Sequence, residues 1–244
     1  MRFKLNKKNT DNQEAYGNSG LKAKTLTFPF NQYINLLPAR NDLHISRKIW
    51  HVSTGLALLY FLFIQTDRFL ILSVLGLLTV LSCFVEFTRL RNPRVNEFCV
   101  RAFGMIIRTS EVHSVSGMPY YAASCFLALS IFPEKVAVLS ILYLTFGDPI
   151  ASFVGILSKK KAIPILKGKS FQGTAAAFLT CALLTWLYLK STTLFSLDLI
   201  RMTLLGGFAG AVAELLPLEI DDNFTIPMVS GFIMWLGLIL LHFV

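Results

Sequence analysis

The stretch VAVLSILYLTFGDPIASFVGILS, residues 136–158, has a single charged residue, Asp148, with twelve uncharged residues before it and ten after it. A helix of this length is long enough to cross the hydrocarbon core of a bilayer, which takes about 20 apolar residues. The stretch is therefore predicted to form a membrane-spanning helix with one carboxylate inside it.

Six further apolar runs lie on either side of this stretch, at residues 49–65, 69–85, 117–133, 173–189, 199–216 and 226–244. The chain of 244 residues is 54% apolar and 15% charged, whereas soluble domains carry roughly 25% charged residues. We therefore predict an all-α integral membrane protein with about seven transmembrane helices, formed by residues 47–244. Residues 1–46 are polar and basic and are predicted to be a cytoplasmic N-terminal segment. The first 25 of them have no apolar core of a signal peptide.

The lysines and arginines indicate the orientation. Nineteen of the 23 lie before the first run or in the loops on the same side of the membrane, and only four lie on the other side. The positive-inside rule then places the N-terminus and both of these loops, between the second and third runs and between the fourth and fifth runs, in the cytoplasm, and the C-terminus outside. The net charge of +9 is explained by this topology and by contact with anionic lipid headgroups, and requires no nucleic acid. Arg94, Glu97, Arg101 and Arg108 share one face of an expected interfacial amphipathic helix between the second and third runs.

Asp148 is unusual because an ionised Asp at the centre of a membrane helix costs about 2.5–3.5 kcal/mol on insertion scales. Gly147 and Pro149 flank it, and this combination predicts that the helix breaks or kinks here. Broken helices persist at membrane depth where they line a polar cavity. The alternative is that Asp148 pairs with a neighbouring Arg and serves only packing.

Two polar segments extend this picture. The loop KKKAIPILKGKSFQG, residues 159–173, lacks the first Gly and the strand of a P-loop, but Lys169 and a helix starting near Gly173 are suited to phosphate oxygens. The acidic segment after the sixth run contains no Lys or Arg, and its oxygen ligands suit Mg²⁺: Glu214, Glu219, Asp221, Asp222 and Asn223. A solvated acidic loop is the alternative.

Further polar residues are expected on the same side of the membrane. Arg47 and His51 are four residues apart and share a helix face. Glu86 and Arg89 are three apart and are expected to form an ion pair. Basic phosphate holders and carboxylates thus converge at the cytoplasmic side with Asp148, which predicts a site for phosphoryl or nucleotidyl transfer.

At these residues the chain resembles the membrane lipid kinases that include dolichol kinase, phytol kinase and the CTP-dependent diacylglycerol kinase, which are distantly similar to phosphatidate cytidylyltransferases. Five motifs occur in the order of that family: R-K-x-x-H (Arg47, Lys48, His51), E-x-x-R (Glu86, Arg89), G-D-P-x-A-x-x-x-G (Gly147, Asp148, Pro149, Ala151, Gly155), K-x-S-x-x-G-T (Lys169, Ser170, Gly173, Thr174) and D-D-N-x-T-I-P (Asp221, Asp222, Asn223, Thr225, Pro227). Two positions depart from the family pattern, Gln172 and Ile156.

The resemblance implies CTP as phosphoryl donor and a lipid hydroxyl as acceptor, with the site facing the cytoplasm from a bacterial inner membrane, an endoplasmic reticulum or a plastid membrane. Asp148, Asp221, Asp222 and Asn223 are then expected to hold Mg²⁺, and His51 or Glu86 to take the proton from the acceptor. The residues expected to bind nucleotide are Arg47, Lys48, Arg89, Lys169, Ser170, Gly173 and Thr174. The residues expected to shape the site are Gly117, Gly147, Pro149, Gly155 and Glu214.

Two alternatives remain at this stage. A phosphatidate cytidylyltransferase would use the same residues and release pyrophosphate. An ion-coupled transporter would use a broken fourth helix to bind its ion, although no internal repeat relates the two halves of the chain. The sequence does not choose among diacylglycerol, phytol and polyprenol as the acceptor, and leaves the oligomeric state open.

Overall fold

The structure, a computed structural model, describes residues 30, 34, 37, 45–158, 163–166, 169–191, 196–217 and 220–240. The predicted N-terminal segment, residues 1–46, therefore lies almost entirely outside the described residues. The elements in chain order are α2 (Ile45–Phe63), α3 (Arg68–Arg91), α4 (Pro93–Phe103), η2 (Thr109–Glu111), α5 (Gly117–Ile131), α6 (Glu134–Leu142), η3 (Tyr143–Gly147), α7 (Asp148–Leu157), β1 (Pro164–Leu166), β2 (Lys169–Ser170), α8 (Phe171–Leu189), α9 (Ser196–Leu215) and α10 (Asp222–Leu240).

The helices confirm a helical membrane protein. Each of the seven predicted apolar runs coincides with a helical segment. Four helices of the described chain are long and apolar enough to cross a membrane: Arg68–Arg91, Glu134–Leu157, Phe171–Leu189 and Asp222–Leu240. Helix α5 is apolar but shorter. The count of seven spans and the orientation stay predictions.

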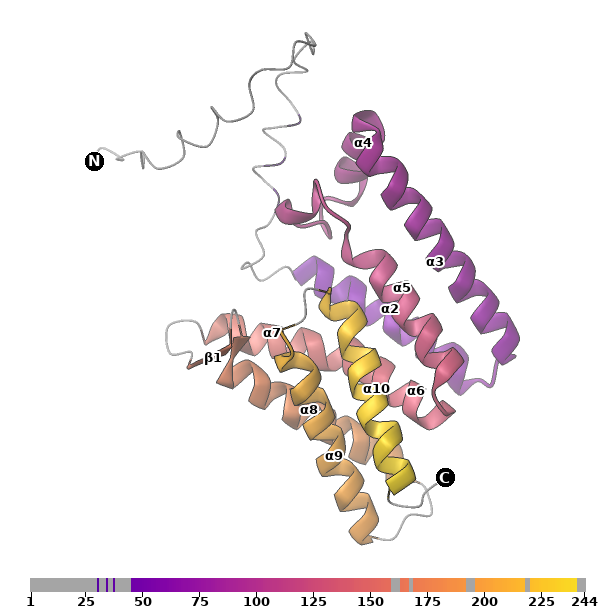
Figure 1. Cartoon of the computed structure of the whole chain (residues 1–244), viewed down its shortest axis with the longest axis vertical. Helices are drawn as coiled ribbons and strands as arrows, with labels where there is room; N and C mark the ends of the chain where they lie inside the picture. The colour runs from indigo at the N-terminus through magenta and orange to yellow at the C-terminus, as the bar shows by residue number, and fades with distance from the viewer. Residues whose placement is uncertain are drawn as a thin grey trace, which may run out of the picture.

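The continuous helix formed by α6, η3 and α7 lies at the centre of the bundle. In its most apolar window 67% of the residues are buried, against 11% in α3, and Leu139, Ile141 and Leu144 belong to the main core. Helix α3 lies along one side of the molecule and packs on α5 and α4 (Figure 1). Its outer face carries large apolar side chains such as Leu77, Val80 and Phe84, as expected of a helix that contacts lipid.

Small residues bring the helices around this centre into close contact. A Cβ atom at Gly55 of α2 would overlap the side chain of Thr145 in η3. Gly206 of α9 lies against Tyr143 and Thr185, whose hydroxyl groups are 2.5 Å apart. Glycines at such contacts let membrane helices approach closely, and here they fix α2 and α9 against the segment that ends at Asp148.

The predicted break at Gly147-Asp148-Pro149 is found as a widening of the helix. Residues Tyr143–Gly147 form a π-turn, and the backbone N–H of Asp148 donates to the carbonyl of Tyr143, five residues earlier. Pro149 has no N–H to offer the carbonyl of Thr145, four residues before it, so a regular α-turn would lack that bond in any case. The helix accommodates one extra residue in the π-turn, a feature often found at functional sites.

Helix α4 confirms a surface helix after α3 and corrects its extent. Asn92 links the two helices: its N–H donates to the carbonyl of Thr88 at the end of α3, and its side chain accepts from the N–H groups of Arg94 and Val95 at the start of α4. Phe98 is 70% exposed, and the buried residues are Asn96, Cys99 and Val100. The helix ends at Phe103, before Gly104, so Arg108 does not share its polar face as predicted.

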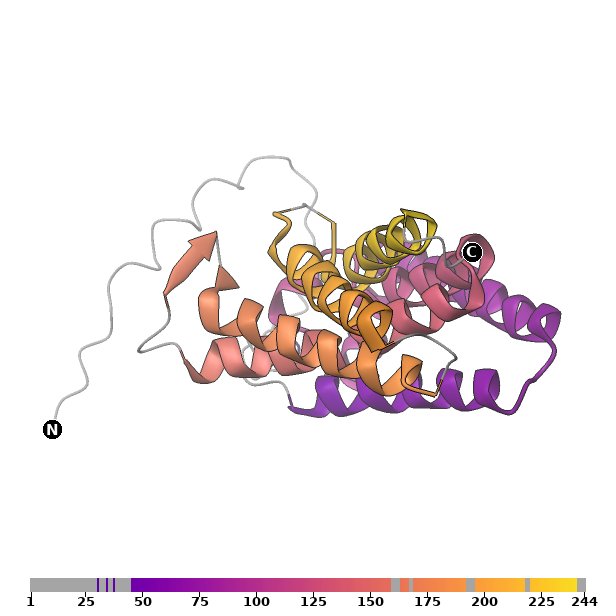
Figure 2. The ribbon, with the colours of Figure 1, turned by 90° about the horizontal axis from the view of Figure 1, so that it is seen from below.

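The basic loop before α8 contains two short antiparallel strands, which the sequence did not predict. Pro164 pairs with Ser170 and Leu166 with Lys169, and Figure 2 shows the strands at one end of the molecule, beside the first turn of α8. Helix α8 starts at Phe171, two residues before the predicted Gly173. The strand pairing therefore delivers Lys169 and Ser170 directly to the start of a helix.

Candidate functional site

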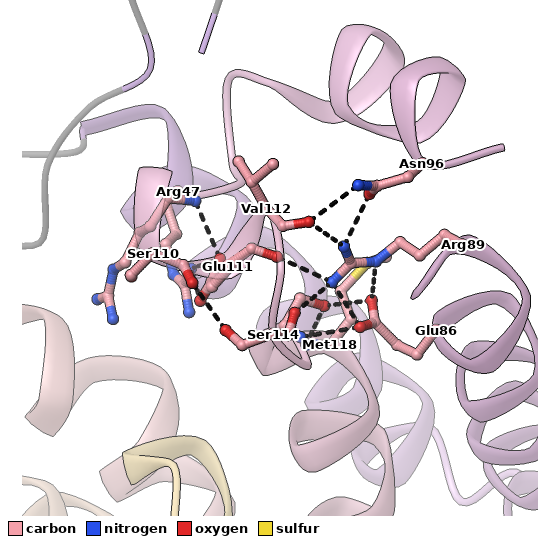
Figure 3. Close-up of polar contacts among 11 residues, drawn as sticks. Arg47, Glu86, Arg89, Asn96, Ser110, Glu111, Val112, Ser114 and Met118 are labelled. Atoms are coloured by element: carbon pink, nitrogen blue, oxygen red, sulfur yellow. Dashed lines mark hydrogen bonds and ion pairs between the residues drawn. The ribbon is translucent and has the colours of Figure 1, made fainter. Parts of the chain in front are cut away.

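Glu86 and Arg89 form the ion pair predicted for them and are both buried (Figure 3). Arg89 donates from Nε to Oε1 of Glu86 at 2.9 Å and from Nη2 to Oε2 at 2.6 Å. The same two carboxylate oxygens also accept from the hydroxyl and the backbone N–H of Ser116, at 2.8 and 2.9 Å. Four donors therefore occupy the Glu86 carboxylate, which favours a positioning role over its predicted role as a proton acceptor.

Arg89 uses its remaining donors on the loop between α4 and α5. It donates to the carbonyl oxygens of Glu111, Val112 and Ser114 and to the side chain of Asn96, over distances of 2.7 to 3.3 Å. Asn96 in turn donates to the carbonyl of Val112 at 3.0 Å. Arg89 is only 2% exposed, so it shapes this loop from inside and the predicted contact with nucleotide gains no support.

The loop ordered by Arg89 presents Glu111 to Arg47 at the start of α2. Arg47 Nη1 lies 2.7 and 2.9 Å from the two carboxylate oxygens of Glu111, and the backbone N–H of Arg108 donates to the same carboxylate at 3.0 Å. A Cβ atom at Gly117 would lie 2.6 Å from Nη2 of Arg47 and would overlap the amide of Asn223. The predicted residues Arg47, Gly117 and Asn223, from α2, α5 and α10, therefore meet at one place.

Asp221 and Asn223 form the start of α10 at this place. Asp221 Oδ1 accepts from the N–H of Asn223 at 2.9 Å, and Asn223 donates from its amide to the carbonyl of Gly117 at 3.3 Å. Burial raises the pKa of the Asp221 carboxyl, against the opposing hydrogen bond from Asn223 and the charge of Arg47. These contacts fix the start of α10 against α5, and the second carboxylate oxygen of Asp221 has no hydrogen bond among the described residues.

Lys169 lies between two carboxylates on the other side of the start of α10. Its Nζ is 2.9 Å from Glu214 at the end of α9 and 3.1 Å from Asp222. Burial alone would lower the pKa of Lys169, but these carboxylates outweigh it and raise the pKa. Lys169 is therefore a permanent cation, and Oε2 of the buried Glu214 has no hydrogen-bond partner among the described residues.

Asp148 faces this cluster from the π-turn. It is partly buried and interacts electrostatically with Asp222, Lys169 and Lys48. Within the described part of the chain its carboxylate forms no hydrogen bond or ion pair. Arg108 lies within electrostatic range of Asp148 but makes no direct contact with it, so the alternative of an Asp–Arg pair that serves packing is not found as a contact. Lys48 donates to the carbonyl of Pro149 at 3.1 Å and contacts the hydroxyl of Ser152, which holds α2 against the first turn of α7.

The first turn of α8 packs against α7 through the predicted small residues. A Cβ atom at Gly173 would lie 3.1 Å from the carbonyl of Ala151, and Gly155 and Gly173 each lie against Ser170. The hydroxyl of Ser170 accepts from the N–H of Gly173 at 3.2 Å, and Thr174 donates to the carbonyl of Ser170. Ser170 thus caps α8, and the predicted phosphate contacts of Ser170, Gly173 and Thr174 stay predictions.

His51 lies buried one helical turn beyond Arg47. Its ring contacts Tyr121 of α5 edge-on, with ring centroids 4.7 Å apart. No described residue gives Nε2 of His51 a hydrogen-bond partner. Of the two predicted proton acceptors, His51 therefore has an available nitrogen, whereas Glu86 has no available lone pair.

The carboxylates fit an ion that arrives with a ligand better than one held by the protein alone. Among the residues that the structure describes, no group of three His, Cys, Asp or Glu side chains is placed to hold a metal ion. Mg²⁺ commonly binds through one or two carboxylates together with substrate phosphates. The unpaired Asp148, with Asp222 beside it, offers such a partial set. Glu219 and Lys159–Lys161 lie outside the described residues.

Arg108 joins the same site and was missed by the sequence analysis. It interacts electrostatically with Arg47, Glu111, Asp148 and Asp221. The signal that could have separated it from α4 is Gly104, since glycine commonly ends a helix. Four residues beyond that end, Arg108 is free to turn toward α2 and α10.

Three of the known proteins that the chain resembles carry the same name. The chain is 29% identical over 210 residues to the CTP-dependent diacylglycerol kinase 1 of Eremothecium gossypii, covering 78% of this chain and 66% of that protein, just under two thirds. It is 29% identical to the protein of the same name in Schizosaccharomyces pombe, covering 79% and 92%, and 27% identical to that in Saccharomyces cerevisiae, covering 78% and 72%. No family model matches the chain, and no solved structure matches it significantly.

Proposed function

We infer that this chain is a member of the CTP-dependent lipid kinases, and we propose that it transfers the γ-phosphoryl group of CTP to the hydroxyl group of diacylglycerol. The observation that carries the proposal is the meeting of an unpaired carboxylate, Asp148, with the Lys169–Glu214–Asp222 cluster and with Lys48 and Arg108. Arg108 in turn lies within electrostatic range of the Arg47–Glu111 pair. Charges of both signs around a partly buried carboxylate suit the handling of phosphate groups. The names of the three relatives supply the donor and the acceptor.

The reaction forms a bond between the lipid oxygen and the γ-phosphorus and breaks the bond from that phosphorus to the oxygen bridging the β-phosphate. The electron pair of the broken bond leaves with CDP. The hydroxyl proton goes to a base. His51 is the candidate, because its Nε2 has no hydrogen-bond partner among the described residues. A loose transition state for phosphoryl transfer demands little of such a base and depends mainly on positioning and charge.

The residues divide these tasks by their surroundings. Arg47 and Lys169 are cations fixed by carboxylates at 2.7 to 3.1 Å, so they present charge in set positions without the need to reorganise. Lys48 holds α2 to the carbonyl of Pro149. Glu86 and Arg89 act indirectly, because they shape the loop that carries Glu111.

Mg²⁺ bound with the nucleotide would neutralise the phosphate charges, and Asp148 and Asp222 are the side chains that would hold it. Asp221 and Asn223 would complete the set from the start of α10. We place this site at the cytoplasmic side, because the basic loops that surround it mark that side by the positive-inside rule.

The direct test is to incubate the purified protein in detergent micelles with γ-labelled CTP, Mg²⁺ and a panel of diacylglycerol, phytol and polyprenols. We expect label in the phosphorylated diacylglycerol and CDP as the second product. Label from α-labelled CTP in the lipid, with release of pyrophosphate, would instead identify a cytidylyltransferase. Transfer from ATP but not CTP would overturn the donor alone, and label in phytol or polyprenol would overturn the acceptor.

A further inference from the structure

Four basic side chains surround the site, and three of them already have protein partners. Arg47 is paired with Glu111, Lys169 with Glu214 and Asp222, and Lys48 with the carbonyl of Pro149. Arg108 differs from these three. Its side chain has no hydrogen bond or ion pair among the described residues, and its Nε is buried without a partner.

The surroundings make an unpaired guanidinium unfavourable here. The backbone of Arg108 is fixed by its bond to Glu111, and Ile107 next to it is buried in an apolar cluster with Val100 and Val112. Burial is the largest effect against the charge of Arg108, and Arg47 and Lys48 repel it. The carboxylates of Glu111, Asp148 and Asp221 attract it, but none forms a direct ion pair with its side chain among the described residues. A buried polar group left unpaired destabilises the folded protein, and does so more strongly when it is charged.

Binding of an anion would give the Arg108 guanidinium the partner that it lacks. A guanidinium presents several N–H donors in a planar fork that matches the oxygens of a phosphate group. Arg108 lies within electrostatic range of both Asp148 and Asp221, the carboxylates on either side of the start of α10. A phosphate at that place would meet the free donors of Arg108 and the charge of Arg47 together.

We propose that Arg108 binds a phosphate group of the ligand and is the residue of the site reserved for that purpose. This assignment rests on the proposed function for the identity of the ligand, which is either the nucleotide phosphates or the phosphate of the lipid product. The site itself requires only phosphate chemistry. Arg108 has therefore a different task from Arg89, whose donors are all spent on the protein.

The test compares Arg108→Gln with Arg101→Gln in the purified full chain. Both variants remove one positive charge from the same segment, but Arg101 is exposed and pairs only with Glu97 on α4. Thermal unfolding is followed with no ligand, with pyrophosphate, with CTP and with cytidine, and phosphatidate is added to the micelles in a separate series. Arg108→Lys keeps the charge and removes the planar fork.

We expect Arg108→Gln to unfold at the same temperature as the wild type or higher without ligand. The variant loses no side-chain hydrogen bond or ion pair among the described residues, and relief from burying the charge offsets the lost attraction to Glu111, Asp148 and Asp221. We expect its affinity for pyrophosphate and CTP to fall by on the order of 10- to 100-fold, as for loss of charge-assisted hydrogen bonds. The affinity of Arg108→Lys for these ligands should lie between those of Arg108→Gln and the wild type, and that of Arg101→Gln should match the wild type. Cytidine, which has no phosphate, should bind all four proteins alike. Loss confined to phosphatidate would assign the phosphate to the lipid product.

Two results would overturn the proposal. One is unchanged binding of pyrophosphate, CTP and phosphatidate in Arg108→Gln. The other is a lower unfolding temperature without ligand and no change in affinity, which would make Arg108 structural. If the wild type transfers no label from CTP but still binds pyrophosphate through Arg108, the phosphate site stands and the kinase assignment alone fails.

Discussion

At the scale of single residues, Asp148 is the clearest link between sequence and site. A lone carboxylate in an apolar run was enough to predict that it lies at a polar site, because burial of that charge needs a reason. The structure places it within electrostatic range of Asp222 and Lys169, and its role in the reaction stays a prediction. The membrane topology predicted that Lys169 and Glu214 lie on the same side as Asp148, but it did not predict the ion pairs of Lys169 with Glu214 and Asp222, because topology and periodicity do not set distances between side chains of distant segments. The role of Arg89 was missed for the same reason, since spacing reveals Glu86 but not the loop carbonyls that follow more than 20 residues later.

Asp148→Asn tests the central carboxylate. The variant keeps the size of the side chain and removes the charge, so we expect the fold to persist and turnover to fall by at least ~10²-fold, or about 2.7 kcal/mol of transition-state stabilisation. Asp198→Asn on α9 is the matched control, because Arg201 is the ion-pair partner that the described residues give to Asp198. The measurement is the rate of label transfer from γ-labelled CTP in each variant. Near-normal activity of Asp148→Asn would show that this residue serves only packing.

Gly117→Ala tests the contact of α2, α5 and α10. The added methyl group would displace the ends of the Arg47 and Asn223 side chains, which can move, so we expect a folded protein with turnover reduced ~10-fold or more. Gly76→Ala serves as control, because its Cβ would lie at an ordinary 3.4 Å from Phe126. Equal activity of the two variants would show that the position of Arg47 is unimportant.

Arg89→Ala tests the buried ion pair by stability instead of rate. Removal of one partner from a buried pair typically destabilises a protein by about 3–5 kcal/mol, because the other charge is left alone. We expect a lower unfolding temperature for Arg89→Ala, and a smaller further loss when Glu86→Ala is added. Additive losses in that double-mutant cycle would contradict the coupling.

At the scale of elements, apolar runs predicted where helices lie but not how they are distorted. The residues Gly147-Asp148-Pro149 indicated an irregular helix, and the choice between a break and a π-turn depends on Thr145 and Tyr143 packing against α2, α8 and α9. The end of α4 was misplaced for a local reason, since apolar periodicity continues through Met105 and Ile106 after Gly104 has ended the helix.

Pro149→Ala tests the π-turn. The new N–H can donate to the carbonyl of Thr145, so we expect the turn to relax toward a regular α-helix and to rotate Asp148 away from Lys169. Turnover should fall while the unfolding temperature holds or rises. Ile150→Ala, at the exposed next position, is the control, and full activity in Pro149→Ala would separate the π-turn from function.

At the scale of the whole molecule, the charge asymmetry predicts which surface faces the cytoplasm. Cysteine labelling tests this orientation. The background is Cys83→Ser, which removes the one exposed cysteine among the four, so that only a newly introduced cysteine reacts. We expect Arg94→Cys to react with a membrane-impermeant reagent from the cytoplasmic side and Lys190→Cys from the other side. The reverse pattern would place the site away from cytoplasmic nucleotide.

The junction at Asn92 has a mechanical consequence. Asn92 ends α3 and precedes α4: its N–H is hydrogen-bonded to α3 and its side chain to the start of α4. The angle between the two helices is therefore held rigidly. Asn96 on α4 and Arg89 on α3 both hold the carbonyl of Val112. When a bilayer of different thickness tilts α3, this corner and the loop that carries Glu111 should move together. The acyl chain length of the bilayer lipids should therefore change the position of Arg47, which pairs with Glu111.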